Sequence, residues 1–227
     1  MHLTKRTQDL PEFYINNSKL SDQTVVKDLG IYISNDFKWT SHINKIYNNA
    51  RITSYFIIKF TKTRNIWILI KLYKTYIRPK VEYNTPVWCP SLTKNIKKIE
   101  KIQKDFTRFA FIRCKIPYED YSDRLMKINL KTLEDRRKFH DLVFLYKTIQ
   151  GTTGLEFKNF FHFCARSYNL RSTEMKINTN HFYKNSIWCN SFFNRSIKLW
   201  NSLPFEVKSS ISLPIFKNKL SRVEFSK

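Results

Sequence analysis

The sequence predicts a mainly α-helical protein with a small antiparallel β piece near its N-terminus. Apolar residues recur three and four positions apart in several long segments, which is the pattern of helices with one buried face. Only 3 Gly in 227 residues argue against a mostly β protein with many tight turns. A β-branched, partly alternating run occurs within residues 10–38. With 42% hydrophobic residues, the chain can build a core and is not disordered as a whole.

Residues 10–38 predict short strands. Phe13, Tyr14 and Ile15 precede the turn-prone pair Asn16-Asn17, and residues 24–33 are rich in β-branched side chains. Strands this short do not form a stable sheet alone. We therefore expect this piece to need partners, which can lie outside this chain.

Several segments beyond residue 40 predict helices. Ser41 is expected to cap the first, and Pro79 to end the second, because the residue before a proline is disfavoured in helical geometry. Gly151 and Gly154 are stop signals for a later one. Residues 155–187 are aromatic and poorly periodic, so no helix is assigned there. The expected helices are 41–60, 65–78, 93–115, 120–129, 130–150, 191–200 and 212–221.

The segment 93–115 combines an apolar stripe with a high density of bases. The stripe consists of Ile96, Ile99, Ile102, Phe106 and Phe109. The bases between them are Lys94, Lys97, Lys98, Lys101, Lys104 and Arg108, opposed by Glu100 and Asp105. Over about nineteen residues such a helix runs roughly 28 Å, close to one turn of a nucleic-acid duplex at ~34 Å. The pattern fits a phosphate-binding rod, but a solvated basic face alone would have the same pattern.

The charge distribution favours a polyanionic partner. The formal net charge is +23, while residues 1–40 hold five bases and five acids. The whole excess therefore lies in residues 41–227, where 36 bases face 13 acids. Such self-repulsion is typical of proteins that bind a polyanion. A membrane surface is the competing polyanion, and it is less favoured because no basic cluster adjoins an apolar anchor.

The sequence predicts no metal site and no targeting segment. The four cysteines, Cys89, Cys114, Cys164 and Cys189, form no Cys-x-x-Cys pair. A metal site from His162, Cys164, His181 and Cys189 is conceivable, but buried inert thiols are favoured. The N-terminus has no apolar signal core, and the apolar stretch 66–77 is broken by two lysines. We therefore expect a soluble intracellular protein, in the nucleus or the cytoplasm.

Catalytic patterns are also absent. Metal-dependent phosphoryl transfer needs two positioned carboxylates, but the chain has no Asp-Asp pair. Tyr118-Glu119-Asp120-Tyr121 superficially resembles a polymerase Tyr-x-Asp-Asp box, yet it lacks the second Asp and is expected to start a helix. Glu134-Asp135 fits another helix start, with acids at the positive end of the dipole. Residue chemistry alone thus predicts a protein that binds and does not catalyse.

Five spaced motifs resemble, in order, the region downstream of the catalytic motif in reverse transcriptases of non-LTR retrotransposons, the LINE-like, jockey-type elements. These motifs cover most of the chain. They are Lys27-Asp28-Leu29-Gly30-Ile31-x-Ile33-Ser34-Asn35-Asp36-x-x-Trp39-x-x-His42-Ile43, Leu72-Tyr73-x-x-Tyr76-Ile77-Arg78-Pro79-x-Val81-Glu82-Tyr83-x-x-Pro86-Val87-Trp88-x-Pro90, Ile99-Glu100-Lys101-Ile102-Gln103-Lys104-x-Phe106-Thr107-Arg108, Leu130-x-x-Leu133-Glu134-x-Arg136-Arg137-x-x-x-Asp141-Leu142-x-x-x-Tyr146-Lys147 and Phe192-Phe193-x-Arg195-x-x-x-x-Trp200-Asn201-x-Leu203-Pro204.

The resemblance implies a parent enzyme with fingers, palm and thumb that copies RNA into DNA with two magnesium ions. It implies the end of a palm-like β segment in residues 1–40, with Met1-His2-Leu3-Thr4 as a palm strand. It further implies a thumb-like helical domain in 41–116 and a helical C-terminal region in 117–227. The fingers and the catalytic acids have no counterpart here, so no catalytic residue and no cofactor is expected in this chain.

A thumb holds a template–primer duplex without reading its sequence, which calls for Lys and Arg on stiff helices. The expected partners are RNA, an RNA–DNA duplex or a DNA backbone. A second hypothesis is an assembly fragment that docks on a separate fingers–palm polypeptide, and a third is a polymerase assembled in trans. Base stacking is conceivable for Trp67, Trp88, Phe192, Phe193 and Trp200, but core packing is favoured. The expected nucleic-acid-binding residues are Lys45, Arg51, Lys59, Lys97, Lys98, Lys101, Lys104 and Arg108.

Overall fold

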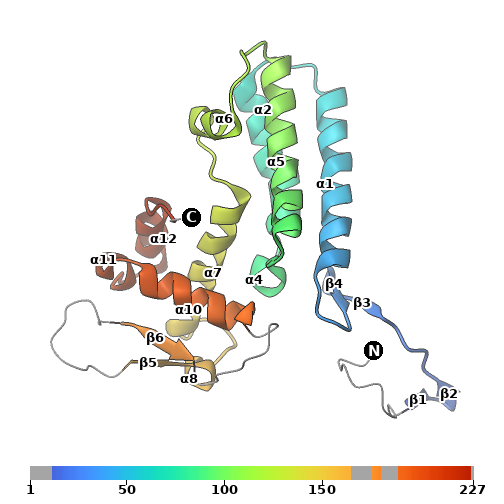
Figure 1. Ribbon diagram of the computed structural model, residues 1–227, viewed down its shortest axis with the longest axis vertical. Helices are drawn as coiled ribbons and strands as arrows, with labels where there is room; N and C mark the ends of the chain where they lie inside the picture. Colours follow the sequence, from blue (N-terminus) through green and yellow to red (C-terminus); the bar gives the residue numbers. More distant parts are fainter. Residues whose placement is uncertain (1–11, 165–174, 180–188, 226–227) are drawn as a thin grey trace. The chain divides into compact units, whose positions relative to one another are not determined.

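The computed structural model describes residues 12–164, 175–179 and 189–225. These residues form a mainly helical protein with small antiparallel strand pairs, which confirms the predicted fold class (Figure 1). The chain divides into two compact units. Unit 1 comprises Met1–Val81 and Leu92–Ile116, and unit 2 comprises Glu82–Ser91 and Pro117–Lys227. The strand expected at residues 1–4 and the candidate ligand His181 lie outside the described residues.

Two hairpins open unit 1, as the sequence predicts. Their strands are β1 (Tyr14–Ile15), β2 (Ser18–Lys19), β3 (Val25–Asp28) and β4 (Ile31–Ser34). β1 and β2 pair antiparallel, and so do β3 and β4. Asn16 and Asn17 have φ of 49° and 59°, the left-handed conformation that a tight two-residue hairpin requires and that Asn tolerates.

The second hairpin is attached to helix α1 (Thr40–Phe60) through a buried histidine. The backbone N–H of Tyr32 donates to Nδ1 of His42 at 3.2 Å. Burial lowers the pKa of His42 to about 4, so the ring is neutral near pH 7 and can accept this bond. The expected cap at Ser41 is wrong, because α1 begins at Thr40 with Trp39 at the cap position.

The second predicted helix does not end at Pro79. It consists of α2 (Ile66–Leu72), a π-helical turn η1 (Tyr73–Ile77) and α3 (Arg78–Glu82). In η1 the N–H of Arg78 reaches back five residues to the carbonyl of Tyr73. This wider turn makes room for the proline ring, which would clash with a carbonyl of a regular helix. The helix therefore continues through Pro79.

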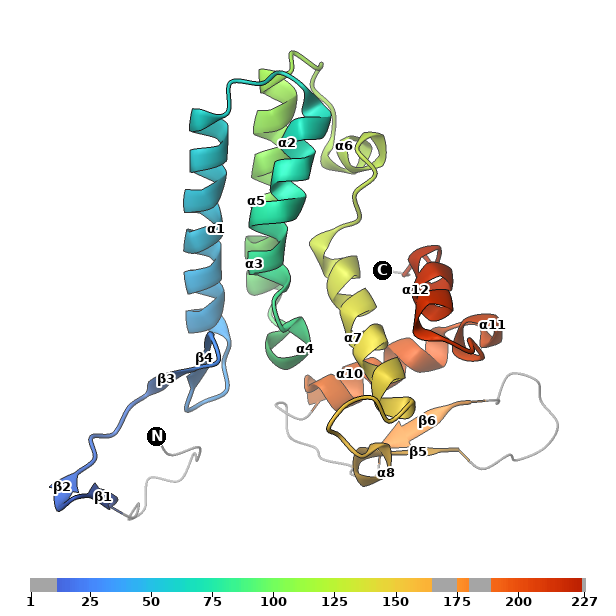
Figure 2. The same cartoon turned by 180° about the vertical axis from the view of Figure 1, so that it is seen from behind.

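The basic segment forms α5 (Thr93–Arg113), which packs against α1 and α2 (Figures 1 and 2). Ile99, Ile102 and Phe106 are buried as predicted, but Phe109 is 54% exposed. Ala110 and Phe111 are buried instead. Because α5 has neighbours on two sides, its buried arc is wider than the apolar stripe and includes polar residues. They are Asn95, Gln103 and Thr107.

Unit 2 is built around α7 (Leu133–Ile149), which contacts α4, α10 and α12. Its core contains Leu142, Tyr146, Trp200 and Phe216, and the rings of Tyr146 and Phe216 stack at 4.3 Å. The other elements are α4 (Thr85–Trp88), α6 (Tyr121–Lys127), α8 (Phe157–Phe160), α10 (Phe192–Ser202), α11 (Phe205–Lys208), α12 (Leu213–Ser221), β5 (Phe161–Phe163) and β6 (Ile177–Thr179).

The aromatic residues follow the core-packing prediction with one exception. Trp88 and Trp200 are fully buried in unit 2, and Phe192 and Phe193 are half-buried there. Phe192 packs edge-on to Phe144 at 5.1 Å between ring centroids. For Trp67 the prediction of core packing is wrong, because its side chain on α2 is 59% exposed. The residues of α2 that are buried are its neighbours Leu69 and Ile70.

Candidate nucleic-acid interface

A row of four bases lies on the solvent-facing side of α5. Lys97, Lys101, Lys104 and Arg108 are all exposed, and their spacing of four, three and four residues places them within an arc of about 60°. We call this row the basic ridge. Over its eleven-residue span the helix rises about 17 Å. A nucleic-acid strand presents a phosphate about every 3.4 Å of helix axis, so the ridge can face roughly five phosphates.

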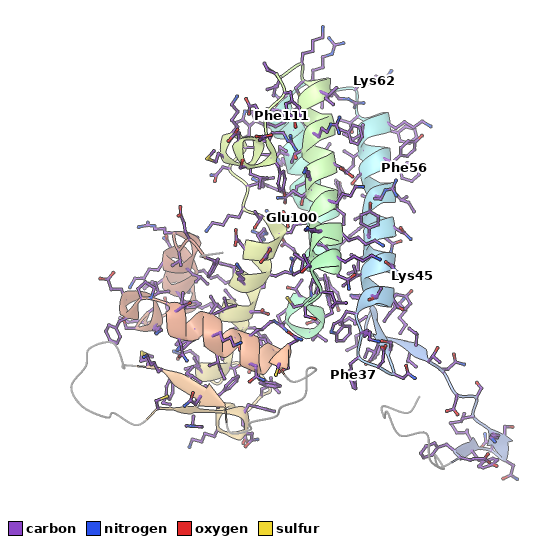
Figure 3. All side chains as sticks on the ribbon, in the orientation of Figure 1. Phe37, Lys45, Phe56, Lys62, Glu100 and Phe111 are labelled. Carbon is purple, nitrogen blue, oxygen red and sulfur yellow. The ribbon has the colours of Figure 1, made fainter. Side chains whose placement is uncertain are left out.

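Acidic residues flank the basic ridge without lying on it. Glu100 and Asp105 are half-buried, and Figure 3 shows Glu100 on the side of α5 that faces away from α1. Lys97, Lys101 and Arg108 form no ion pair with any residue that the structure describes. Their charges are therefore exposed to solvent and accessible to an anionic partner.

Two more of the predicted bases lie where α1 and α5 pack together. Lys98 is half-buried, and its ammonium donates to Oδ1 of Asn44 and lies 5.0 Å from the centre of the Tyr47 ring. Arg51 covers the same ring at 5.5 Å. Each such cation–π contact is worth about 0.5–1 kcal/mol at exposed sites. Lys98 and Arg51 thus hold positive charge beside the ridge and also contribute to helix packing.

The remaining two predicted bases lie on the other side of α1. Figure 3 shows Lys45 on the face of this helix that points away from α5. Its ammonium is 5.9 Å from the Tyr32 ring, and that of Lys59 is 5.3 Å from the Tyr55 ring. All eight predicted residues therefore belong to unit 1. They form a ridge on α5, a pair between the helices and a pair on the outer face of α1.

The sequence analysis did not identify how few acidic residues lie near these bases. Residues 37–81 contain ten bases and neither Asp nor Glu. A count of acids over shorter segments reveals this stretch, whereas the count over the whole of residues 41–227 hides it. Lys80 is tied to α1 by a 2.7 Å bond to Oγ1 of Thr53. The bases of this stretch that were not among the predicted binding residues are Lys38, Lys62, Arg64, Lys71, Lys74, Arg78 and Lys80.

The segment that resembles a polymerase box starts a helix. Asp120 occupies the N-cap position of α6. Glu119, the residue before it, forms an ion pair with Lys127, the last residue of α6. Glu134 and Asp135 likewise lie in the first turn of α7, where Oγ1 of Thr132 accepts from the N–H of Asp135 at 3.0 Å. Both segments therefore have the helix-start role that the sequence predicts.

The described residues do not fit a magnesium site. No group of three or more His, Cys, Asp or Glu side chains is close enough to hold a metal ion within the described ranges. The cysteines of the described chain are unlinked; Cys189 is exposed, and the other three are half-buried. Burial raises the pKa of the Cys89 thiol. No reaction step through a metal is therefore derived for this chain.

Among the described residues, no helix is both long enough and apolar enough to cross a lipid bilayer.

Comparison with known proteins gives one weak relative. The chain is similar to a Caenorhabditis elegans protein described as "Uncharacterized protein B0403.1", with 26% identity over 126 residues. The match covers 56% of this chain and 64% of that protein, so the chain spans less than two thirds of its relative's length. No family model matches the sequence, and no solved structure matches it.

Proposed function

We propose that this chain binds the sugar–phosphate backbone of nucleic acid through unit 1, as a reverse-transcriptase-derived thumb and C-terminal region without catalytic carboxylates. The spaced motifs that resemble non-LTR retrotransposon reverse transcriptases support the origin. The basic ridge supports the binding. The expected ligands are an RNA–DNA duplex, RNA or DNA, since phosphate contacts carry no sequence information.

The observation that carries this proposal is the exposure of Lys97, Lys101, Lys104 and Arg108 on one side of one helix. Glu100 and Asp105 flank the row, and the neighbouring stretch 37–81 contains no acid. A regular row of cations on a rigid helix matches a regular row of phosphates. This match requires no base contact.

A salt titration tests the proposal. The probe is a fluorescein-labelled RNA–DNA duplex of about 20 base pairs, with affinity measured by anisotropy between 50 and 200 mM salt. Contact with ~6 phosphates predicts a fall in affinity of roughly 10³ over this range. The ridge variant replaces all four ridge residues by Gln. It should bind at least about 10²-fold more weakly at 100 mM salt, with a slope smaller by about 3–4, because each lost phosphate contact contributes about 0.9.

A matched control removes the same charge from unit 2. The variant Lys198→Gln, Lys217→Gln, Lys219→Gln, Arg222→Gln changes four exposed bases of α10, α12 and the residue after α12. We expect its salt slope to stay within about one of the unchanged protein. Equal losses in the two variants would mean that only net charge matters, and the ridge assignment would then be wrong.

A second function, assembly with a separate polypeptide, is favoured by the first hairpin. Phe13, Tyr14, Ile15 and Leu20 are 48–60% exposed, and within the described ranges the two-residue strands β1 and β2 pair only with each other. A fingers–palm polypeptide is the partner that the motif resemblance suggests. Primer extension with that polypeptide, with and without this chain, tests it. Equal product in both reactions would contradict assembly into an active polymerase.

A further inference from the structure

The outer face of α1 carries a group of exposed aromatic side chains that the phosphate-binding model does not use. Tyr55, Phe56 and Phe60 are 58%, 52% and 67% exposed, and Ile52 is 55% exposed. We call the three aromatic residues the aromatic face, and Ile52 is their apolar neighbour on the same helix. Figure 3 shows Phe56 pointing away from α5, on the same side of α1 as Lys45. A 21-residue helix rarely exposes so much apolar surface without a partner.

The rings of the aromatic face form an ordered array. Phe56 and Phe60 stack with centroids 5.7 Å apart and an interplanar angle of 15°, and Tyr55 meets Phe56 edge-on at 6.0 Å. The ammonium of Lys59 lies 5.3 Å from the Tyr55 ring and 5.7 Å from the Phe60 ring. A cation is therefore placed among the rings.

We propose that the aromatic face of α1 binds unpaired nucleotides, stacking bases on Tyr55, Phe56 and Phe60 while Lys59 and Lys45 contact the phosphates. This inference rests on the proposed function and names a second, single-stranded form of the same ligand. Aromatic side chains interleaved with bases are the general composition of sequence-tolerant single-strand sites. Every base has a π face, so such a site needs no hydrogen-bond readout.

Charge complementarity favours nucleic acid over an apolar protein surface as the partner. α1 contains Lys45, Arg51 and Lys59 and no acidic residue. A purely apolar partner surface would have to bury the Lys59 ammonium without a counter-ion, which costs several kcal/mol. A single strand supplies a phosphate for the cation and a base for the ring at the same step. One ligand then supplies a partner for both the Lys59 ammonium and the aromatic rings.

The first experiment compares a 15-nucleotide single-stranded RNA with an abasic oligonucleotide of the same length and charge. Stacking of a base on an aromatic side chain contributes about tenfold or more per base. We expect the RNA to bind at least tenfold more tightly than the abasic strand. Equal affinity for the two would overturn the stacking proposal and leave the phosphate-binding function intact.

Variants separate a π contact from a merely apolar one. Tyr55→Leu with Phe56→Leu keeps apolar side chains on the helix surface but removes two rings. We expect single-strand affinity to fall about tenfold or more, with duplex affinity unchanged within twofold. Phe56→Trp enlarges the π face and should bind the single strand at least as tightly as the unchanged protein. Ile52→Ala is the matched control and should change single-strand affinity less than twofold.

The outcomes separate the two proposals. Circular dichroism first establishes that each variant keeps its helix content, which is expected because the changed side chains are exposed. If the ridge variant loses duplex binding while the Leu variant keeps full single-strand affinity, only the stacking inference fails. If the ridge variant binds duplex as tightly as the unchanged protein, the proposed function fails. A loss of single-strand affinity in the Leu variant, with affinity kept in the Phe56→Trp variant, supports stacking.

Discussion

The two units use their charged residues in opposite ways. In unit 2, acids and bases pair inside the fold: Arg195 bonds Asp141 at 2.7 Å, and Arg136 with His140 holds Glu82. In unit 1, the bases of the ridge point to solvent, and residues 37–81 offer no acid at all. Buried pairs hold tertiary structure, whereas exposed cations raise the energy of the isolated molecule through repulsion. The buried ion pairs of unit 2 therefore serve the fold, whereas the exposed bases of the ridge in unit 1 are available to a partner.

The largest effect is expected from the most buried charge of unit 2. Asp141 is 1% exposed and accepts from Nε and Nη2 of Arg195 at 2.7 and 3.1 Å. Asp141→Asn leaves the guanidinium buried without a carboxylate, which should cost about 3–5 kcal/mol of unfolding free energy. Urea denaturation measures this, since urea does not screen charge. Glu134→Gln removes a half-exposed carboxylate of the same helix, 3.7 Å from Lys138, and should cost less than about 1 kcal/mol.

The next largest effect on the unfolding free energy comes from Glu82 and depends on pH. Burial alone would raise the pKa of Glu82, but hydrogen bonds from Arg136 and His140 outweigh it and lower the pKa to about 2. An unfolded Glu titrates near 4.5. The stabilisation is therefore complete above pH 4.5 and is lost as the pH falls toward 2. The difference corresponds to about 3 kcal/mol.

Glu82→Gln tests this linkage. The variant should lose about 3 kcal/mol at pH 7 and should show a flatter decline of stability between pH 4.5 and 2, measured by urea denaturation at several pH values. Glu224→Gln, an exposed site near the C-terminus, should follow the unchanged protein. Parallel pH profiles for the unchanged protein and Glu82→Gln would contradict the assignment.

Local patterns allowed much of unit 1 to be predicted, and long-range pairing explains what was missed. The strands, α1 and the basic helix α5 follow from periodicity and turn residues that act over a few positions. The burial expected for Phe109 was wrong, and that of Ala110 was not predicted, because the buried arc of α5 depends on where α1 and α2 lie. Pro79 was misjudged because a π turn accommodates the ring within a helix.

In unit 2 the sequence indicated helix starts but not ion pairs. Arg195 and Asp141 are 54 residues apart, as are Arg136 and Glu82, so spacing along the chain carries no sign of either pair. For the candidate interface, the sequence predicted five binding bases on α5, and four of them share one side of the helix because of the 3.6 residues per turn. The contacts of Lys98 and Arg51 with the Tyr47 ring could not be predicted from the sequence, because they depend on how α1 and α5 pack together.

A smaller effect is expected in the polar part of the unit 1 core. The hydroxyl of Tyr73 donates to Oε1 of Gln103 at 2.7 Å, and both side chains are fully buried. Tyr73→Phe removes this donor to the buried amide and should cost about 1–2 kcal/mol. Tyr76→Phe changes a 55% exposed residue of the same π turn and should stay within about 0.5 kcal/mol. Equal costs for the two would mean that the buried bond contributes nothing.

The smallest effect on stability is expected from the ridge variant, and it tests the comparison most directly. Gln and Lys have similar helix propensities, and the four ridge side chains are exposed, so the unfolding free energy should change by less than about 0.5 kcal/mol. A slight gain is the expected sign, because four charges leave a strongly basic unit. Thermal and urea denaturation at low salt measure this. A loss above about 1 kcal/mol would mean that the ridge serves the fold, as the charges of unit 2 do.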